Sequence, residues 1–287
     1  MEPGHIARCA QLAMLLEVSA TPKPGNIDRD HNYPDTRFEH FLASAVGVYP
    51  VLETAASSHS GVGSLIRQAV MESARWQRGG NTHFGAFILL IPLVMAAGEC
   101  DARACLKARV KKVVRSTTIE DAVELYRTFS LAKVRVKPVN DLDLGDKSSI
   151  DKIRERRLTL FDLMKLSSGY DIIADEWVND FKRTFECADL ILEKSRIYNI
   201  NDTVVLTFME LLSRNKDTFI QTKFDITEAE EVSMRAKEIL EKGDIDDIRG
   251  EIRSFDEELL RKGINPGSTA DIIIGGLFIS LFEGMRF

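Results

Sequence analysis

Apolar residues recur every three or four positions along most of the chain, a spacing typical of α-helices rather than strands. Only one short stretch, at 134–139, alternates as a strand would, and it contains a proline. Capping pairs at Thr118 and Asp121, and at Thr227 and Glu230, support the helical interpretation. The pattern predicts helices at 5–18, 37–57, 62–77, 82–98, 102–115, 118–132, 150–168, 171–195, 202–215, 227–241, 245–262 and 268–284.

Two of these helices are predicted to be buried, because residues 86–98 and 272–282 are apolar almost all round. Neither run reaches the roughly 20 apolar residues that a membrane span needs, so no membrane role is expected. The expected fold class is all-α, with one compact multi-helix domain over residues 1–287. A division into two lobes stays open as an alternative, with the polar segment 137–149 joining them.

The composition is that of a globular protein, since 44% of the 287 residues are apolar and can build a sizeable core. The formal net charge of -6 argues against a nucleic-acid partner, because phosphate contacts need a basic surface. The start of the chain lacks a basic region followed by an apolar one, so we expect a cytoplasmic protein. The cysteine spacing fits neither a zinc ribbon nor a disulfide scaffold, and we expect reduced, buried thiols. These cysteines are Cys9, Cys100, Cys105 and Cys187.

Three polar clusters rich in Gly, Pro, Asn and Asp stand at the ends of apolar stretches. They cover residues 21–31, 79–86 and 265–271 and read TPKPGNIDRDH, GGNTHFGA and NPGSTAD. Turn residues alone would make ordinary connections, but these clusters also carry charged and imidazole groups. Each cluster is therefore a candidate binding or catalytic segment.

In the first cluster, Pro22 and Pro24 stiffen the chain and Gly25 permits a sharp turn, so that polar side chains can be held in one place. Lys23 is suited to meet a phosphate as a point charge. Carboxylates are ligands that Mg²⁺ accepts together with waters and substrate phosphates. The candidates are Asp28, Asp30 and Asp35. The alternative is a Pro-rich turn with solvated charges.

The second cluster precedes an apolar helix, with Asn81 or Thr82 as its N-cap. Unpaired backbone amides at a helix N-terminus form a natural anion site. His83 in the first turn could donate a hydrogen bond to a phosphate or to a base, although a purely structural histidine is the alternative. Helix propensity does not explain a glycine at position 85, because glycine destabilises a helix relative to alanine. We therefore expect close packing or a close ligand there.

The third cluster repeats this arrangement, with Pro266 and Gly267 in the turn and Ser268 or Thr269 as the N-cap. The ordinary account of Asp271 is a carboxylate near a helix N-terminus. The helix that follows is apolar almost all round, however, so this carboxylate stands where a buried helix meets solvent or a cleft. We expect the three clusters to meet in one nucleotide cleft formed by helix N-termini and loops.

Together the clusters resemble the motifs of the ATP:dephospho-CoA triphosphoribosyltransferases, also called triphosphoribosyl-dephospho-CoA synthases. Residues 21–29 match T-P-K-P-G-x-V-D-R with Ile27 in place of Val. Residues 81–85 match N-T-H-x-G, and residues 266–271 match P-G-x-[ST]-A-D. The T-N-x-x-x-R-G-G stretch of bacterial members has only Asn201-Asp202-Thr203 and Ser213-Arg214-Asn215 as counterparts.

The resemblance implies a Mg²⁺-dependent transferase that moves the triphosphoribosyl group of ATP to the ribose 2′-hydroxyl of dephospho-CoA and releases adenine. The product would be 2′-(5″-triphosphoribosyl)-3′-dephospho-CoA. Catalytic roles are implied for Asp28, His83 and Asp271, and a metal site for Asp28 and Asp271. Residues implied in binding ATP or the other substrate are Lys23, Gly25, Asn26, His31, Asn81, Thr82, Gly267 and Ser268.

Three alternatives stay open at this point. The first is the same ATP-dependent glycosyl transfer to another phosphorylated coenzyme precursor. The second is a non-catalytic helical protein that binds nucleotide, and the third is a Mg²⁺-dependent nucleotide hydrolase. The assembly state is open as well, with a homodimer among the options.

Overall fold

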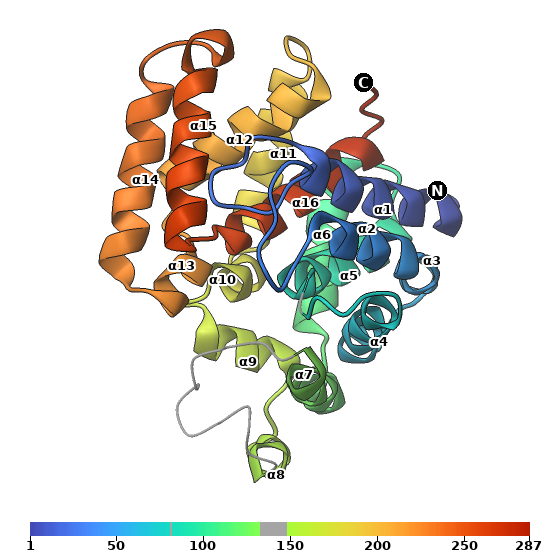
Figure 1. Ribbon diagram of the computed structural model, residues 1–287. Helices are drawn as coiled ribbons and strands as arrows, with labels where there is room; N and C mark the ends of the chain where they lie inside the picture. The colour runs from blue at the N-terminus through green and yellow to red at the C-terminus, as the bar shows by residue number, and fades with distance from the viewer. Residues whose placement is uncertain (81, 133–147) are drawn as a thin grey trace.

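The computed structural model describes residues 1–80, 82–132 and 148–287, and in this part of the chain the regular structure is helical throughout. The all-α prediction is thereby confirmed (Figure 1). The helices are α1 (Pro3–Ser19), α2 (Phe38–Gly47), α3 (Tyr49–Ala56), α4 (Val62–Arg75), α5 (Phe84–Ala97), α6 (Arg103–Arg115), α7 (Ile119–Ala132), α8 (Ser148–Glu155), α9 (Leu160–Ser167), α10 (Ile172–Val178), α11 (Lys182–Lys194), α12 (Ile200–Arg214), α13 (Thr218–Lys223), α14 (Ile226–Leu240), α15 (Ile245–Lys262) and α16 (Gly267–Phe282).

The core is built around α5 and α16, the two helices that the sequence predicts to be buried. Nearly every residue of both helices is buried, and α16 packs against α1, α5 and α11 (Figure 1). A Cβ at Gly276 would lie 2.4 Å from the Sγ atom of Cys187 on α11, so a glycine is needed at this helix crossing. Burial of apolar surface on all sides of α16 fixes where its N-terminal residues lie.

Several predicted helices are divided in two. The prediction at 37–57 becomes α2 and α3, which meet at Val48 with Pro50 in the first turn of α3. The predictions at 150–168 and 171–195 likewise each become two helices, and α13 was not predicted. Apolar periodicity continues across a short break, so the period alone does not find an interruption of one to four residues. The proposed strand at 134–139 and most of the linker at 137–149 lie outside the described residues.

Carboxylates cap many of the helices. The predicted pair at Thr118 and Asp121 forms, with the Thr118 amide donating to Asp121 Oδ2 at 2.8 Å and the Asp121 amide donating to Thr118 Oγ1 at 3.2 Å. The pair predicted at Thr227 does not cap α14, because Asp225 takes that position and accepts from the Glu228 amide at 2.9 Å. An aspartate directly before the helix competes successfully for the free amides.

Asp217 caps two helices at once. Its Oδ1 atom accepts from the amides of Phe219 and Ile220 at the start of α13. Its Oδ2 atom accepts from the amide and the hydroxyl of Thr269 in α16 at 2.7 and 2.8 Å. Burial raises the pKa of this carboxyl to about 6. The prediction that Ser268 or Thr269 is the N-cap of α16 is wrong. Pro266 occupies the N-cap position, and the Asp217 carboxylate accepts the hydrogen bonds at this helix start.

The cysteine prediction is half correct. Cys9 and Cys187 are free, buried thiols, as expected. Cys100 and Cys105 form a disulfide across the turn between α5 and α6, which contradicts the expectation of reduced thiols for this pair. Four residues stand between them, and the helix start brings their Cα atoms to 5.6 Å. None of the helices in the described residues combines the length and hydropathy needed to cross a membrane.

Candidate active site

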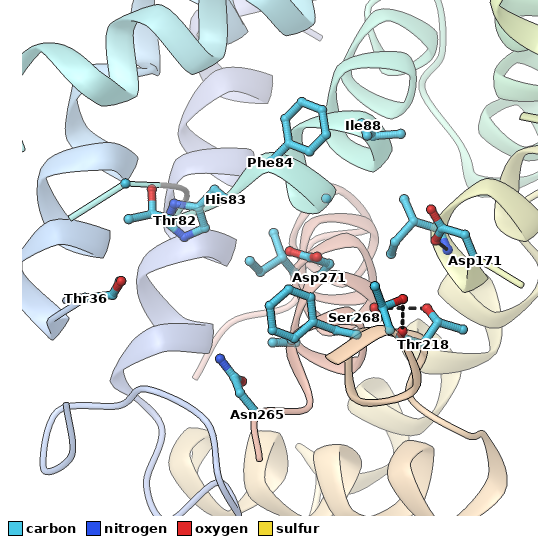
Figure 2. Close-up of a pocket in the computed structure, with 18 of the residues that line it drawn as sticks. Thr36, Thr82, His83, Phe84, Ile88, Asp171, Thr218, Asn265, Ser268 and Asp271 are labelled. Carbon is cyan, nitrogen blue, oxygen red and sulfur yellow. Dashed lines mark hydrogen bonds between the residues drawn. The ribbon is translucent and has the colours of Figure 1, made fainter. Parts of the chain in front are cut away.

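A cavity of about 920 Å³ lies where the starts of α5, α10, α13 and α16 converge (Figure 2). Its volume is near the upper end of the roughly 300–1,000 Å³ typical of ligand sites, which leaves room for a large ligand or for two. Polar lining from loops and helix starts includes Asn26, Thr36, Thr82, His83, Asp171, Thr218, Asn265, Ser268 and Asp271. The charged residues Glu17, Asp35, Arg78 and Lys223 also line the cavity. Apolar lining comes from α5, α7, α9 and α10: Phe84, Ile88, Leu125, Tyr126, Phe129, Leu163, Met164 and Ile173.

Asp271 projects from α16 against the start of α5. Its carboxylate accepts a hydrogen bond from the Ala86 amide, and a Cβ at Gly85 would lie only 2.1 Å from its Oδ2 atom. Gly85 of the second cluster therefore makes room for the Asp271 carboxylate of the third cluster. Two motifs about 190 positions apart in the sequence thus meet through this one contact.

The electrostatic surroundings of Asp271 are acidic. Burial raises its pKa well above the ordinary value, and the charges of Glu17, Asp217 and Asp171 raise it further. Asp171 caps α10, also lines the cavity, and has a pKa that burial raises. Among the described residues neither Asp171 nor Asp271 pairs with a Lys, Arg or His side chain. Both carboxylates therefore line the cavity without a cationic side-chain partner in the described residues.

His83 is the N-cap of α5 and is almost completely buried at the cavity wall. Its Nδ1 atom lies 2.8 Å from the Ser44 hydroxyl, while its Nε2 atom has no hydrogen-bond partner in the structure. Burial and, to a lesser extent, the charge of Lys23 lower the pKa of this imidazole to about 3. His83 is therefore neutral at physiological pH and acts as a hydrogen-bonding group rather than a cation.

A chain of hydroxyls sets the orientation of this ring. Ser73 donates to the Ser44 hydroxyl at 2.7 Å, which leaves the Ser44 proton free for His83 Nδ1. The imidazole proton then resides on Nε2. Thr82, predicted as a substrate ligand or N-cap, does not cap α5 and lies 3.2 Å from the Ser73 hydroxyl. The serines at positions 44 and 73 were not predicted, because buried hydroxyls on helices carry no sequence signature.

Most of the first cluster faces the protein interior instead of the cavity. Lys23 has no exposed surface and pairs with Glu17, and its Nζ atom also donates to Asn26 Oδ1 at 2.9 Å. Asn26 does line the cavity, and it donates to Asn265 of the third cluster at 2.9 Å. Gly25 is outside the lining, has a φ of +71°, and would place a Cβ 2.2 Å from the Ile264 carbonyl.

Asp28 holds the loop in shape. It is fully buried and accepts from the backbone amides of Lys23, Asp30 and His31 at 3.3, 2.9 and 3.0 Å. It does not line the cavity, whereas Asp271 does. Among the described residues, the group of three carboxylate, thiol or imidazole side chains close enough to hold a metal ion is Asp28, His31 and Asp256. Asp271 is not part of that group.

The structure thus brings part of the predicted site together. Asn26, Thr82, His83, Gly267, Ser268 and Asp271 line one cavity. Lys23, Gly25, Asp28 and His31 lie outside its lining, and Asn81 lies outside the described residues. The sequence analysis missed Glu17, Asp171 and the aromatic residues of α5, α7 and α13 that also line the cavity. These residues sit on ordinary amphipathic helices or caps, where nothing in the pattern marks them.

A cavity that combines helix N-termini, two carboxylates and a neutral imidazole is suited to catalysis, and the relatives of this chain are transferases. The chain belongs to the ATP:dephospho-CoA triphosphoribosyl transferase family, whose model matches residues 3–286. The resemblance drawn from the three motifs is therefore confirmed.

Individual relatives agree with this assignment. A 2-(5″-triphosphoribosyl)-3′-dephosphocoenzyme-A synthase of Klebsiella pneumoniae is 23% identical over 97% of this chain and 91% of its own length. A probable enzyme of the same name from Pseudomonas savastanoi pv. phaseolicola is 24% identical over the same shares. The crystal structure of a candidate triphosphoribosyl-dephospho-CoA synthase from Archaeoglobus fulgidus has a TM-score of 0.71 and 28% identity, and covers 85% of this chain and all of its own.

Proposed function

We propose that this protein transfers the triphosphoribosyl group of ATP to dephospho-CoA with release of adenine, in a Mg²⁺-dependent reaction that gives 2′-(5″-triphosphoribosyl)-3′-dephospho-CoA. The family and its named relatives support the two substrates. The observation that carries the proposal is Asp271, a carboxylate on the cavity wall beside the N-terminus of α5, without a cationic partner in the described residues.

The reaction is a glycosyl transfer. The bond between C1′ of the ATP ribose and the adenine nitrogen breaks, and a bond from C1′ to the acceptor 2′-oxygen forms. The net reaction moves one proton from the acceptor hydroxyl to adenine, and the triphosphate stays intact. The protein must therefore hold a polyanion, assist a departing base and exclude water from C1′.

Magnesium suits the acidic wall of the cavity. Mg²⁺ takes one or two carboxylates together with waters and substrate phosphates, and Asp271 with Asp171 offers this donor set. Without a cation the acidic surroundings favour a proton on Asp271, and a bound Mg²⁺ would displace that proton. When bound, the ion neutralises the triphosphate charge. Asp28, predicted as a second ligand, is fully buried outside the lining, and we assign it to shaping the loop that carries Asn26.

The other polar groups of the cavity serve orientation. The Nε2–H group of His83 is suited to donate to a ring nitrogen of the departing adenine, since the imidazole is neutral and this atom has no hydrogen-bond partner among the described residues. At the start of α16 the Ser268 amide remains to donate to a phosphate oxygen, since the Gly267 amide binds the Asn265 carbonyl and the Thr269 amide binds Asp217. The aromatic and aliphatic residues of α5 and α7 exclude water and pack on apolar parts of the substrates.

The test is mass spectrometry of a reaction that contains the protein, ATP, Mg²⁺ and dephospho-CoA. Free adenine together with the triphosphoribosyl adduct is the expected result, and Asp271→Asn should give neither. Adenine without the adduct would point to another phosphorylated acceptor, or to hydrolysis if free triphosphoribose appears. Tight ATP binding without any adenine would favour a non-catalytic nucleotide-binding protein and overturn the proposal.

A further inference from the structure

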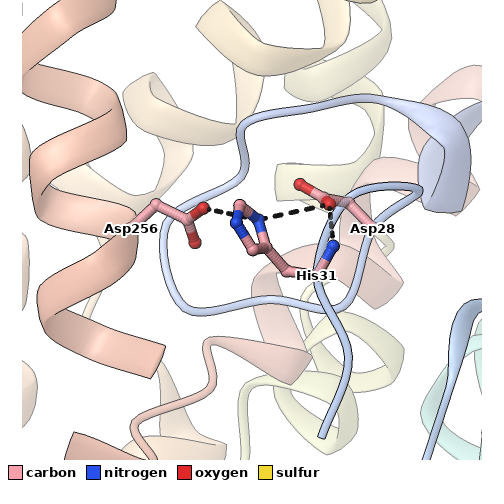
Figure 3. A group of neighbouring side chains, drawn as sticks. All are labelled: Asp28, His31 and Asp256. Atoms are coloured by element: carbon pink, nitrogen blue, oxygen red, sulfur yellow. Dashed lines mark hydrogen bonds and ion pairs between the residues drawn. The ribbon is translucent and has the colours of Figure 1, made fainter. Parts of the chain in front are cut away.

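A second group of ligand-type side chains lies behind the cavity wall, where the loop at residues 20–36 meets α15. It consists of Asp28 and His31 from the loop and Asp256 from α15 (Figure 3). Asp28 and Asp256 have no exposed surface, while the side chain of His31 is 36% exposed. The imidazole therefore gives the group a path to solvent, which an exchangeable ion needs.

The donor atoms converge on one point. His31 Nδ1 lies 2.9 Å from Asp256 Oδ2 and 3.6 Å from Asp28 Oδ1, and all three atoms are within 4.8 Å of one another (Figure 3). Ligand atoms about 2.1 Å from a metal are separated by about 3.0 Å at octahedral angles and about 3.4 Å at tetrahedral angles. The two separations from His31 Nδ1 are close to these values, and 4.8 Å is the upper limit for the ligand atoms of the three residues, which is a spacing that one ion can bridge after small side-chain movements.

Two of these atoms lack a hydrogen bond. His31 Nδ1 and Asp256 Oδ2 are both buried, and despite their separation of 2.9 Å the contact does not have hydrogen-bond geometry. Buried polar atoms are nearly always satisfied, so an unsatisfied acceptor on a fully buried carboxylate needs an explanation. Lys23, whose charge acts on Asp256, does not supply it, because its ammonium group binds Glu17 and Asn26.

The remaining atoms of the group are held in place as metal ligands usually are. The second oxygen of Asp256 accepts from the Gly25 amide at 2.9 Å. Asp28 Oδ1 accepts from the amides of Asp30 and His31. These outer hydrogen bonds leave Asp256 Oδ2 free to bind an ion. Asp28 Oδ2 also accepts the Lys23 amide at 3.3 Å, so one lone-pair site of Asp28 remains for an ion, on Oδ2.

We propose that Asp28, His31 and Asp256 bind a divalent transition-metal ion, of the Mn²⁺ or Zn²⁺ type, at a site separate from the cavity magnesium. Two carboxylates and one imidazole suit these ions better than Mg²⁺, which prefers oxygen ligands alone. The ion pins the loop to α15. It thereby fixes Asn26 and Tyr33, whose hydroxyl donates to the carbonyls of Gly25 and Ile264 at 2.7 and 3.1 Å. Both Asn26 and Tyr33 line the cavity.

Calorimetric titration of the nucleotide-free protein with Mn²⁺, and separately with Zn²⁺, tests the proposal. Besides any binding at the cavity carboxylates, we expect one site whose affinity falls at least tenfold in His31→Ala and in Asp256→Asn. His59→Ala is the matched control, because His59 also contacts a carboxylate, Glu99 at 3.0 Å, but on the surface. Asp271→Asn should leave the affinity of the His31 and Asp256 site unchanged, which separates this site from the catalytic proposal. Unchanged affinity in both His31→Ala and Asp256→Asn, or no binding by the wild type, would overturn the site.

A measurement on the wild type covers the case in which those variants do not fold. Pulsed electron paramagnetic resonance of the Mn²⁺-loaded protein should show coupling to an imidazole nitrogen, and Mn²⁺ should raise the midpoint of thermal unfolding. Absence of the nitrogen coupling at one equivalent of Mn²⁺ would mean that His31 and Asp256 form an ordinary ion pair, and the proposal would fail.

Discussion

The loop at residues 20–36 and the cavity wall at the starts of α5 and α16 have similar compositions but opposite pairing of their polar groups. In the loop, Lys23 binds Glu17 and the Asp28 carboxylate accepts three backbone amides. On the cavity wall, Asp271 has no cationic partner in the described residues and His83 Nε2 has no hydrogen bond. Apart from the contact between His31 and Asp256, the loop satisfies its charges internally, whereas the cavity wall leaves its polar groups for a ligand.

This difference shows how the structural residues of a polar motif can be distinguished from those that contact a ligand. A charged side chain that is buried and paired mainly specifies the fold, because removal of its partner leaves an uncompensated charge. A charged side chain that is buried, unpaired and aimed into a cavity costs free energy in the empty protein. That cost is tolerated where a ligand removes it. Substitutions in the loop should therefore lower mainly the stability of the protein, and substitutions on the cavity wall should lower mainly its activity.

The largest expected effect is on the activity of Asp271→Asn. Loss of this carboxylate should lower the rate of adenine release by about a thousandfold, because the site loses its charge for the cation that holds the triphosphate. Thermal unfolding of the variant should show no loss of stability. Release of adenine within tenfold of the wild-type rate would contradict the assignment of Asp271 to the reacting site.

The stability of the same variant should depend on pH differently from that of the wild type. The pKa of Asp271 is raised in the folded protein, so its contribution to stability is fully present below the unfolded pKa of about 3.9 and is lost as pH rises through the folded pKa. Asparagine does not ionise. The free energy of unfolding of Asp271→Asn, relative to the wild type, should therefore increase from pH 4 to pH 8 in metal-free urea titrations. An equal difference at both pH values would show that the carboxyl titrates normally.

The next effect is on stability and belongs to the loop. Lys23→Met should lower the free energy of unfolding by about 3–5 kcal/mol at neutral pH, because Glu17 is left buried and unpaired. The double variant with Glu17→Gln should recover at least half of this loss. Lys165→Met is the matched control, since Lys165 pairs with Asp162 at the surface, and it should change stability by less than about 1 kcal/mol. A loss of activity with unchanged stability in Lys23→Met would place this lysine at the substrate instead.

A smaller effect is expected where the two motifs touch. Gly85→Ala places a methyl group 2.1 Å from the Asp271 carboxylate and should cost about 1–3 kcal/mol of stability while it displaces the carboxylate. Gly250→Ala in α15 has open space around the new methyl group and should stabilise the protein by about 0.5–1 kcal/mol. Urea unfolding of the two variants measures whether the change in the free energy of unfolding is negative for Gly85→Ala and positive for Gly250→Ala. An equal, stabilising effect of both would show that Gly85 is not needed for packing.

The features of these two regions that depend only on local sequence could be predicted. Helix periods place α5 and α16 correctly, and the two motifs at their starts do meet. Asp256 could not be predicted as a partner of His31, because it lies on a highly charged amphipathic helix where one carboxylate among many carries no signal. Pairing is a tertiary property. Lys23 in the first motif therefore looks like a phosphate ligand until Glu17 is seen beside it.

The smallest effect concerns the orientation of His83. Ser44→Ala removes the hydroxyl next to Nδ1, which should cost about 1 kcal/mol of stability and reduce the rate of adenine release several-fold, with KM for ATP nearly unchanged. The reason is that the ring loses its fixed tautomer, so that Nε2 carries the proton only part of the time. Ser254→Ala, at an exposed position of α15, is the control and should change neither quantity. Because burial lowers the His83 pKa to about 3, the rate deficit of Ser44→Ala should be the same at pH 6 and pH 8. A deficit that appears only below pH 7 would indicate that the imidazole gains a proton there, and that His83 works as a cation rather than as a neutral donor.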